Sequence, residues 1–132
     1  MDLMGNLAVE DLGPQYAISV RQPWAHLILC GYKRVEYRTW RLPEKYWKKW
    51  MFLHVSSAFA AREKSAAMRL QLSDLQFGGY VAHIMFEKPM RKTTPDEISD
   101  YIKGSTCWHW PIRHVIPTGF IPAKGKQGIF TV

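Results

Sequence analysis

Charged and polar side chains capable of ligand chemistry gather in one short stretch near the N-terminus. Arg21 and Gln22 come first, and Lys33, Glu36 and Arg38 follow a segment of mostly apolar residues. A guanidinium group clamps phosphate, an amide reads the edge of a base, and a lysine beside a carboxylate can transfer protons. The stretch therefore predicts a binding edge for a negatively charged ligand.

A strand, a short helix and a second strand are the elements expected to position these side chains. Tyr16–Val20 reads as the first strand, Pro23–Cys30 as the helix and Lys33–Thr39 as the second strand. Proline suits the first helical position, and Gly31 suits the left-handed position after the helix end. The start of a helix offers unpaired N–H groups and partial positive charge, which predicts a seat for an anion beside Arg21.

Each residue of this stretch has a structural alternative to its functional role. As a functional residue, Lys33 contacts a ligand or acts in catalysis. The structural alternative is an exposed lysine in a turn. Glu36 and Arg38 are two residues apart and share one strand face. In the functional interpretation, Arg38 contacts a phosphate or a base edge, and Glu36 orients Arg38 or accepts a base N–H. In the structural alternative, the two form a surface ion pair that adds little stability. Arg21 clamps phosphate, and Gln22 reads a base or only caps the helix.

Five further side chains are candidates for ligand contact. Trp40 and Trp108 have polar or turn-forming neighbours and suit base stacking, or each plugs one end of a barrel. His54 and Ser56 end an apolar strand, where polar groups often enter a cleft, but the two alone form no catalytic triad. Lys124 either holds a phosphate in its glycine-containing turn or stands in solvent.

The net charge of +7 is concentrated in two segments. Residues 21–49 hold eight basic and two acidic side chains, and residues 113–132 hold three basic and no acidic ones. Residues 1–20 hold three acidic side chains and no basic one. Basic charge interleaved with aromatic residues is typical of a surface that binds nucleic acid, although a solvated basic face explains the charge equally well.

The cysteines and histidines predict neither a metal site nor a cofactor. Cys30 and Cys107 form no C-x-x-C pair, and the five histidines have no metal-ligand spacing. Cys30 closes the apolar stripe of Trp24, Leu27 and Ile28, so we expect it to be a buried thiol. Free thiols of this kind fit a reducing cytoplasm.

The rest of the chain reads as short strands with few helices. The further strands expected are Trp50–Val55, Tyr80–Glu87, Trp108–Val115 broken by Pro111, and Ile129–Val132, and the further helices are Ala58–Leu72 and Thr94 to about Lys103. About six strands with tight connections predict an α+β, mainly β fold. We expect a small barrel of mixed or antiparallel strands with two to three peripheral helices. One domain is expected over residues 15–132, after a lead-in of residues 1–14.

Several segments together resemble one known family. They are Ser19-Val20-Arg21-Gln22-Pro23-Trp24-Ala25, Gly31-x-Lys33-x-x-Glu36-x-Arg38-x-Trp40, Phe52-Leu53-His54-Val55-Ser56-Ser57, Gly79-Tyr80-Val81-Ala82-His83-Ile84 and Lys124-Gly125-Lys126-Gln127-Gly128-Ile129-Phe130. In this order they resemble ASCH domains, which are relatives of the PUA superfamily. The resemblance covers roughly residues 16–132. It implies a PUA-like barrel with a cleft beside the first helix, lined by the motif lysine, glutamate and arginine.

The resemblance also implies a function in RNA or nucleotide binding. Some relatives process modified bases or cleave RNA. In one small branch that hydrolyses N4-acetylcytidine, the motif lysine, a threonine three residues later and a distant glutamate are implicated. Lys33 matches that lysine, but Glu36 stands where the threonine would be. Asp96, Glu97 and Asp100 are all conceivable for the distant acid, so this hydrolysis is not carried over.

The leading hypothesis is a cytoplasmic, monomeric protein that binds RNA or a modified nucleotide. Phosphate is expected near Arg21, Lys33 and Lys124, and the base against Trp40 or Trp108, read by Gln22 and Glu36. The sequence has no signal peptide and no apolar stretch of about 18 residues, so we expect no membrane partner.

Two alternatives stay open from the sequence. The first is a hydrolase of RNA or a modified nucleoside, a ribonuclease or amidohydrolase, in which Lys33 and Glu36 transfer protons. The second is a protein-interaction module that uses the apolar surface of residues 46–53 and binds no nucleic acid.

Overall fold

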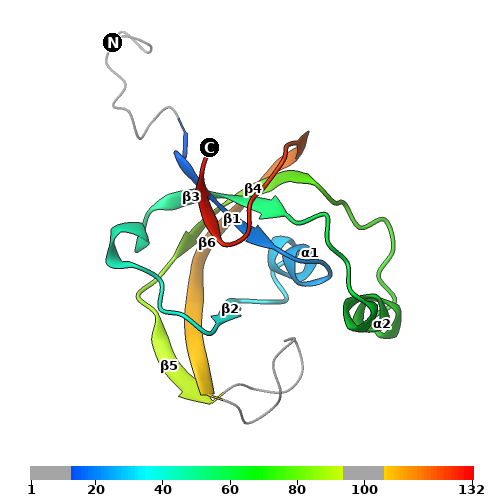
Figure 1. Ribbon diagram of the computed structural model, residues 1–132, viewed down its shortest axis with the longest axis horizontal. Coiled ribbons are helices and arrows are strands. Elements are labelled where there is room, and N and C mark those ends of the chain that lie inside the picture. The colour runs from blue at the N-terminus through cyan, green and yellow to red at the C-terminus, as the bar shows by residue number, and fades with distance from the viewer. Residues whose placement is uncertain (1–12, 94–105) are drawn as a thin grey trace, which may run out of the picture.

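Seven strands of the described residues form one mixed sheet that curls into a half-barrel (Figure 1). The computed structural model describes residues 13–93 and 106–132. The strands are β1 (Tyr16–Val20), β2 (Val35–Arg38), β3 (Trp50–Val55), β4 (Gly79–Phe86), β5 (Met90–Thr93), β6 (Thr106–Pro122) and β7 (Ile129–Thr131). Their order is β2-β6-β4-β3-β1-β7, and β5 pairs with β6. Only β1 and β3 pair in parallel among these strands.

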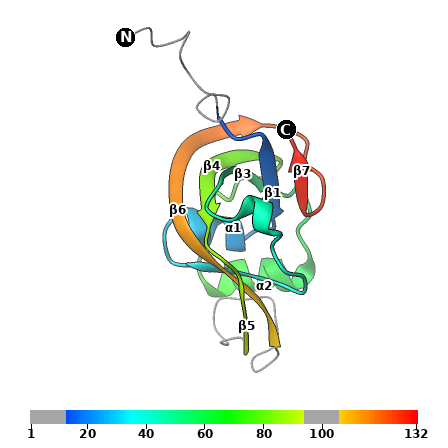
Figure 2. The ribbon, with the colours of Figure 1, turned by 90° about the vertical axis from the view of Figure 1, so that its left-hand side faces the viewer.

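The first helix fills the concave side of the sheet. α1 (Trp24–Leu29) lies within the arch that β6 makes in Figure 2, and it buries Trp24, Ala25, Leu27 and Ile28. These side chains join the inward-facing residues of β1, β3 and β4 in one apolar cluster. Burial of this apolar surface is the main stabilising term of such a fold. The core therefore holds the end of β1 and the start of β2 on either side of α1.

Two further features lie at the periphery. α2 (Ala61–Arg69) buries Ala66, Ala67 and the carboxylate of Glu63. A 3-10 turn, η2 (Glu44–Tyr46), leads from the loop after β2 into β3. In Figure 1, α2 lies at the right of the molecule and β5 at the lower left. No helix within the described ranges has the length and apolar character to cross a membrane.

The expected mainly β fold with peripheral helices is confirmed, but β6 differs from the prediction. The strand continues through Pro111 instead of breaking there. Proline is tolerated in a sheet at irregular positions, where its missing N–H takes no ladder hydrogen bond. The pairing of β6 with β4 shifts register between Met85 and Phe86, beside Pro111.

Three other expectations are corrected or fall outside the described residues. Cys30 is exposed, not buried, because α1 ends at Leu29 and Cys30 follows its last turn. β5 was not expected from the sequence, and α2 begins and ends three residues inside the predicted range 58–72. The helix predicted from Thr94 to about Lys103 lies outside the described residues.

Candidate functional site

A pocket of about 370 Å³ opens where β1, β2 and β3 approach the turn that precedes β7. Its volume lies near the lower end of the range of about 300–1,000 Å³ usual for small-molecule sites. The lining consists of Ser19, Val20, Arg21, Trp24, Glu36, Tyr37, Arg38, His54, Ser56, Ser57, Ala58, Gly125, Lys126, Gln127 and Gly128. Polar groups from four separate segments of the chain therefore converge on one hollow.

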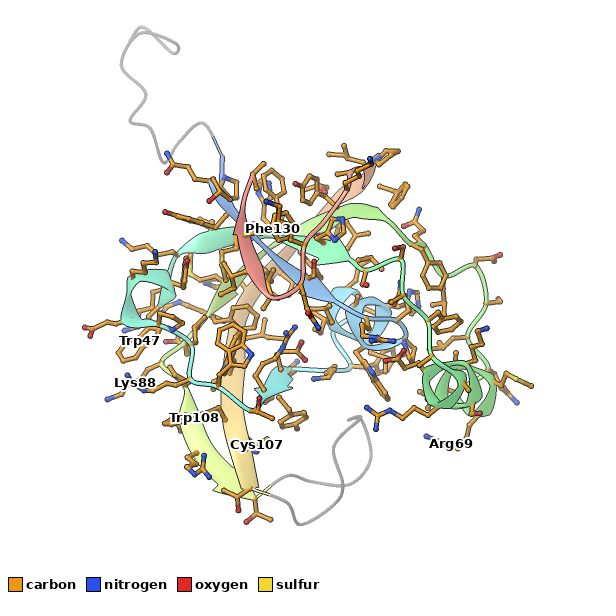
Figure 3. All side chains as sticks on the ribbon, viewed as in Figure 1. Trp47, Arg69, Lys88, Cys107, Trp108 and Phe130 are labelled. Carbon is orange, nitrogen blue, oxygen red and sulfur yellow. The ribbon has the colours of Figure 1, made fainter. Side chains whose placement is uncertain are left out.

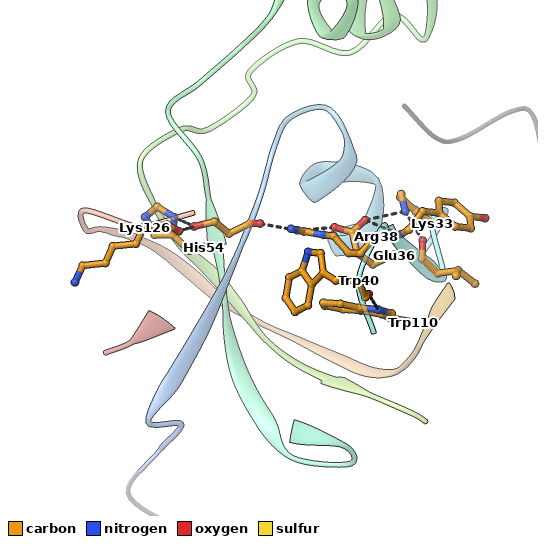
Figure 4. A network of polar contacts seen from close by, with 10 residues as sticks. Lys33, Glu36, Arg38, Trp40, His54, Trp110 and Lys126 are labelled. Atoms are coloured by element: carbon orange, nitrogen blue, oxygen red, sulfur yellow. Dashed lines mark hydrogen bonds and ion pairs between the residues drawn. The ribbon is translucent and has the colours of Figure 1, made fainter. Parts of the chain in front are cut away.

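Arg38 is fixed in this pocket by two acceptors. Its Nη2 donates to Glu36 Oε2 at 3.0 Å and to the Ser19 carbonyl oxygen at 2.7 Å (Figure 4). The Arg38 side chain is 18% exposed, whereas the Glu36 side chain is 8% exposed. Because β2 places the two residues on one face, the carboxylate orients the guanidinium without reaching solvent itself.

Lys33 lies behind Glu36, away from the pocket. Its Nζ donates to Glu36 Oε1 at 3.1 Å and to the Val35 carbonyl oxygen, and it lies 4.5 Å from the centre of the Tyr37 ring. The side chain is only 3% exposed. These contacts occupy the ammonium group, so Lys33 acts on the pocket through Glu36.

Glu36 is the central anion of this network. Burial raises the pKa of its carboxyl, but the positive charges of Lys33 and Arg38 and the hydrogen bonds they donate outweigh burial. The pKa of Glu36 therefore lies below its ordinary value. A carboxylate in this state stays ionised at neutral pH and is a weak proton acceptor.

Arg21 enters the pocket from the end of β1 and is held in the same way. Its Nε lies 3.0 Å from Oε1 and 2.8 Å from Oε2 of Glu63, whose side chain is 2% exposed. Glu63 Oε1 also accepts the Ala60 N–H at the start of α2, at 2.7 Å. The Arg21 side chain is 43% exposed, so its outer edge faces solvent and the pocket mouth.

The turn before β7 is attached to β1 and β3 by a second polar cluster. Ser19 Oγ donates to the Lys126 carbonyl oxygen at 2.7 Å and lies 3.2 Å from His54 Nδ1. His54 Nε2 is 2.8 Å from the Ala123 carbonyl oxygen, to which it donates. The Gly125 backbone packs so closely on the His54 ring that a Cβ there would lie 2.2 Å from Cε1. Side-chain contacts thus fix the position of this turn.

The start of α1 offers less to an anion than the sequence predicts. The Ala25 N–H donates to the Arg21 carbonyl oxygen at 3.1 Å, and the His26 N–H donates to Gln22 Oε1 at 2.9 Å. Gln22 Nε2 donates to the Gln76 carbonyl oxygen, and the whole residue is 2% exposed. Gln22 therefore caps the helix, as in its structural alternative, and does not line the pocket.

The structure brings together about half of the predicted site residues. Arg21, Glu36, Arg38, His54 and Ser56 all line the pocket. Gln22, Lys33, Trp40, Trp108 and Lys124 do not.

The five predicted residues that do not line the pocket are kept from it for different reasons. Lys33 is buried, and Lys124 is an exposed turn residue. Trp40 packs edge-on against Trp110 at 4.7 Å and is 37% exposed, beside Gly128 of the lining. Trp108 faces the guanidinium groups of Arg41 and Arg91.

Other lining residues were not singled out as site residues from the sequence. Ser19 and Tyr37 line the pocket from β1 and β2, and Lys126 and Gln127 line it from the turn before β7. Ser19 has a usable signal, because it stands near the end of β1, two residues before Arg21. Burial raises the pKa of the Tyr37 hydroxyl, with smaller contributions from Cys107 and Glu36, so Tyr37 stays neutral.

The lining is suited to holding an anion. Arg21, Arg38 and Lys126 bring positive charge, and Glu36 brings one negative charge that is already paired with two cations. Within the described residues, no group of three histidine, cysteine or acidic side chains is arranged to hold a metal ion.

A second hollow, of about 630 Å³, lies near Tyr16, Tyr46 and Trp50. Its charged lining consists of the exposed Lys45, Lys48 and Lys49. None of these lysines has an ion pair to a carboxylate within the described residues that would orient it. The smaller pocket is the better candidate because its two arginines are held in place by glutamates.

A family model and a set of solved structures both show a likeness to ASCH domains. The model of the ASCH domain family matches residues 18–57, which include the end of β1 and all of α1, β2 and β3. No curated protein matches the chain significantly in sequence. The expected resemblance to ASCH domains is confirmed over this region by sequence.

Solved ASCH structures extend the likeness to most of the chain. The ASCH protein from Zymomonas mobilis is 13% identical, with a TM-score of 0.59 over 89% of this chain and 86% of that chain. A serine-to-alanine variant of that protein is 14% identical, with a TM-score of 0.58 over 91% of both chains. A tyrosine-to-phenylalanine variant is 15% identical, with a TM-score of 0.55 over 89% of this chain and 88% of that chain. At this identity the likeness establishes the shared fold.

Proposed function

We propose that the pocket binds a nucleotide, free or as part of an RNA chain, with its phosphate between Arg21 and Arg38. One observation carries this proposal: both arginines reach one pocket, and each is held by a buried glutamate. A guanidinium held on one edge keeps its other N–H groups in a fixed direction, which lowers the entropy lost when an anion binds.

The polar groups around these arginines support the same ligand. Lys126 adds a third cation, and the hydroxyl groups of Ser56 and Ser57 lie in the lining. Hydroxyl groups, backbone N–H groups and basic side chains are the usual partners of phosphate oxygens. The pocket is large enough for one nucleotide-sized ligand and too small for a folded macromolecule.

The aromatic residues next to the pocket supply a place for the base. Trp40 is partly exposed and stands beside Gly128, and its ring is fixed edge-on against Trp110. A rigid ring of this kind stacks on any base without strong sequence preference. We therefore keep Trp40 as the stacking residue of the proposal, and assign no base contact to Gln22.

Hydrolysis by Lys33 and Glu36 has weaker support. The Lys33 ammonium is occupied by internal partners, and the lowered pKa of Glu36 makes it a poor proton acceptor. The binding experiment below also detects turnover if the nucleotide is recovered and analysed.

Titration of the protein with nucleoside 5′-monophosphates and short single-stranded RNA tests the proposal. Arg38→Lys keeps the charge but loses the forked geometry, and Arg21→Ala removes one phosphate partner. We expect each change to weaken binding about tenfold, because a hydrogen bond to a charged group contributes on the order of 1.5–3 kcal/mol.

Arg113→Ala is the matched control for these variants. Arg113 also pairs with a glutamate, Glu87 at 2.8 Å, but it lies outside the pocket. We expect wild-type affinity from it. Equal losses in Arg113→Ala and Arg38→Lys, or no nucleotide binding by the unchanged protein, would rule the pocket out as the binding site.

A further inference from the structure

Two tryptophans and three cations alternate in a row on the surface beside the pocket. Lys88 Nζ lies 5.6 Å from the Trp47 ring centre, and the Arg41 guanidinium lies 4.9 Å from the same ring. Arg41 is also 5.7 Å from the Trp108 ring centre, which lies 6.0 Å from Arg91. We call Lys88, Trp47, Arg41, Trp108 and Arg91 the tryptophan–cation row.

The fold assembles this row from three distant parts of the sequence. Arg41 and Trp47 come from the loop around η2, Lys88 and Arg91 from β5 and the loop before it, and Trp108 from β6. Figure 3 shows Trp47, Lys88 and Trp108 together on one side of the molecule, with Arg69 of α2 on the other side. Pairing of β5 with β6 sets Arg91 directly opposite Trp108.

The row lies next to a strand that lines the pocket. Trp108 pairs with Arg38 of β2 on one side and with Arg91 of β5 on the other. Residues directly opposite one another in a sheet point to the same face, so Arg38, Trp108 and Arg91 share one face. Since Arg38 lines the pocket, Trp108 is separated from the lining by one strand-to-strand step.

The side chains of the row are accessible, and one ring is fixed. Arg41, Lys88 and Arg91 are exposed, and both tryptophans are half-buried. The Trp47 indole N–H donates to the carbonyl oxygen of the buried Leu42 at 2.8 Å, which sets the direction of its ring. Fixed aromatic rings lose little entropy when a flat ligand stacks on them.

The charge of the row is not balanced by acidic side chains of the described residues. None of Arg41, Lys88 and Arg91 forms an ion pair with a carboxylate in the ranges 13–93 and 106–132. Attraction between a cation and a tryptophan ring is weak, and it does not offset the repulsion within a row of like charges as an anion would. Alternating rings and cations fit a polymer with alternating flat bases and phosphates.

We propose that the tryptophan–cation row binds the nucleotides adjacent to the one in the pocket, so that the ligand is a single strand of nucleic acid. This inference rests on the proposed function of the pocket and names its substrate class. In a duplex the bases are paired and their faces covered, so the tryptophans would have nothing to stack on.

Binding of a single-stranded oligonucleotide of about six nucleotides, compared with a mononucleotide, tests this proposal. The variants Arg41→Ala, Arg91→Ala and Trp47→Leu change residues of the row and none of the pocket lining. We expect each to weaken oligonucleotide binding about fivefold or more and to leave mononucleotide binding unchanged. Each arginine variant should also reduce the slope of log affinity against log salt concentration by about 0.7.

Arg69→Ala serves as the control, because it removes an equal charge from the end of α2 on the far side. The proposal is overturned if the oligonucleotide binds no tighter than the mononucleotide, or if Arg69→Ala costs as much as the row variants. Equal competition by duplex RNA or by polyglutamate also overturns it, since stacking would then contribute nothing. If the mononucleotide does not bind the unchanged protein, the proposed function of the pocket fails. Mononucleotide and oligonucleotide titrations therefore distinguish a failure of the pocket from a failure of the row.

Discussion

At the scale of single residues, the site depends on one buried carboxylate between two cations. Glu36 accepts hydrogen bonds from Lys33 and Arg38, and of these two cations only Arg38 lines the pocket. Removal of one partner from such a buried cluster leaves the others without a counter-charge, which costs more than the pair itself contributes. Glu36 therefore has a structural role that can be tested without any ligand.

Glu36→Gln should destabilise the fold by about 3 kcal/mol at neutral pH, because Lys33 is left buried without an anion. The pKa of Glu36 is lowered by folding from the value in the unfolded chain, about 4.3. Its stabilising effect is therefore complete above that pH and is lost as the pH falls through the folded value. Urea unfolding at neutral and acidic pH should show a larger acid-induced loss in the wild type than in Glu36→Gln.

Glu44→Gln is the comparison for this experiment, since Glu44 is exposed on η2. We expect it to unfold like the wild type at neutral pH. A Glu36→Gln variant as stable as Glu44→Gln would show that the buried cluster does not hold the site together.

The two thiols should differ strongly in reactivity. Cys30 is exposed, whereas Cys107 is buried and its thiol pKa is raised by that burial, despite the opposing charges of Arg91 and Lys33. Because the thiolate is the reactive form, Cys30 should be alkylated at least about tenfold faster than Cys107 in the native protein. Mass spectrometry of timed samples measures both rates, and equal rates would contradict the burial of β6 at this point.

Residue patterns predicted the same-face arrangement of Glu36 and Arg38 but not the burial of Lys33. Strand periodicity determines which side chains share a face, and the structure agrees at this pair. Lys33 precedes β2, so strand periodicity does not determine the direction in which its side chain points. Its burial depends on Val35, Glu36 and Tyr37 enclosing the ammonium group, and only the folded chain shows this enclosure.

At the scale of elements, the turn before β7 completes the pocket by packing on β3. The His54 ring is 2% exposed and held at both nitrogens, with Gly125 against its face. A side chain at position 125 therefore has no space unless the turn moves away from His54. Movement of the turn would displace Lys126 and Gln127 from the lining.

Gly125→Ala is expected to destabilise the protein by about 1–3 kcal/mol, as overpacking commonly does, and to weaken nucleotide binding. Gly119→Ala is the control. Gly119 has a φ of +77° and open space around its Cβ position, so alanine there is strained by its backbone alone and leaves the pocket unchanged. Urea unfolding and nucleotide titration of both variants separate the effects. Wild-type binding by Gly125→Ala would show that the turn plays no part.

The observed element boundaries agree best with the predicted ones where the hydrophobic periodicity is strong. They differ most at β5 and β6. β1 and β3 have the predicted bounds, because their apolar residues face the core. β5 (Met90–Thr93) is exposed throughout and has no apolar face to signal a strand. It forms because β6 offers it a partner edge.

At the scale of the whole molecule, the basic segments predicted from the sequence lie on both candidate surfaces. Residues 21–49 supply Arg21 and Arg38 to the pocket and Arg41 to the tryptophan–cation row, and Lys126 comes from the second basic segment. The fold class could be predicted from strand spacing and the ASCH-like motifs. The row could not, because its members meet only through the pairing of β5, β6 and β2.

Nucleic-acid binding by the complete chain should weaken steeply with salt. Counterions released from each neutralised phosphate give a slope of about −0.7 per contact for a single strand. With contacts from the pocket and the row together, we expect a slope of about −2 or steeper in a fluorescence anisotropy titration. A slope near zero would indicate that the arginines do not contact phosphate.

The proposed function requires that a phosphate binds between Arg21 and Arg38. Titration of ¹⁵N-labelled protein with a nucleoside 5′-monophosphate tests it most directly. We expect changes in backbone amide shifts to concentrate at Ser19, Arg21, Arg38 and residues 125–128, with little change in α2. Shifts that concentrate elsewhere, or that persist unchanged when Arg21 and Arg38 are both replaced by alanine, would contradict it.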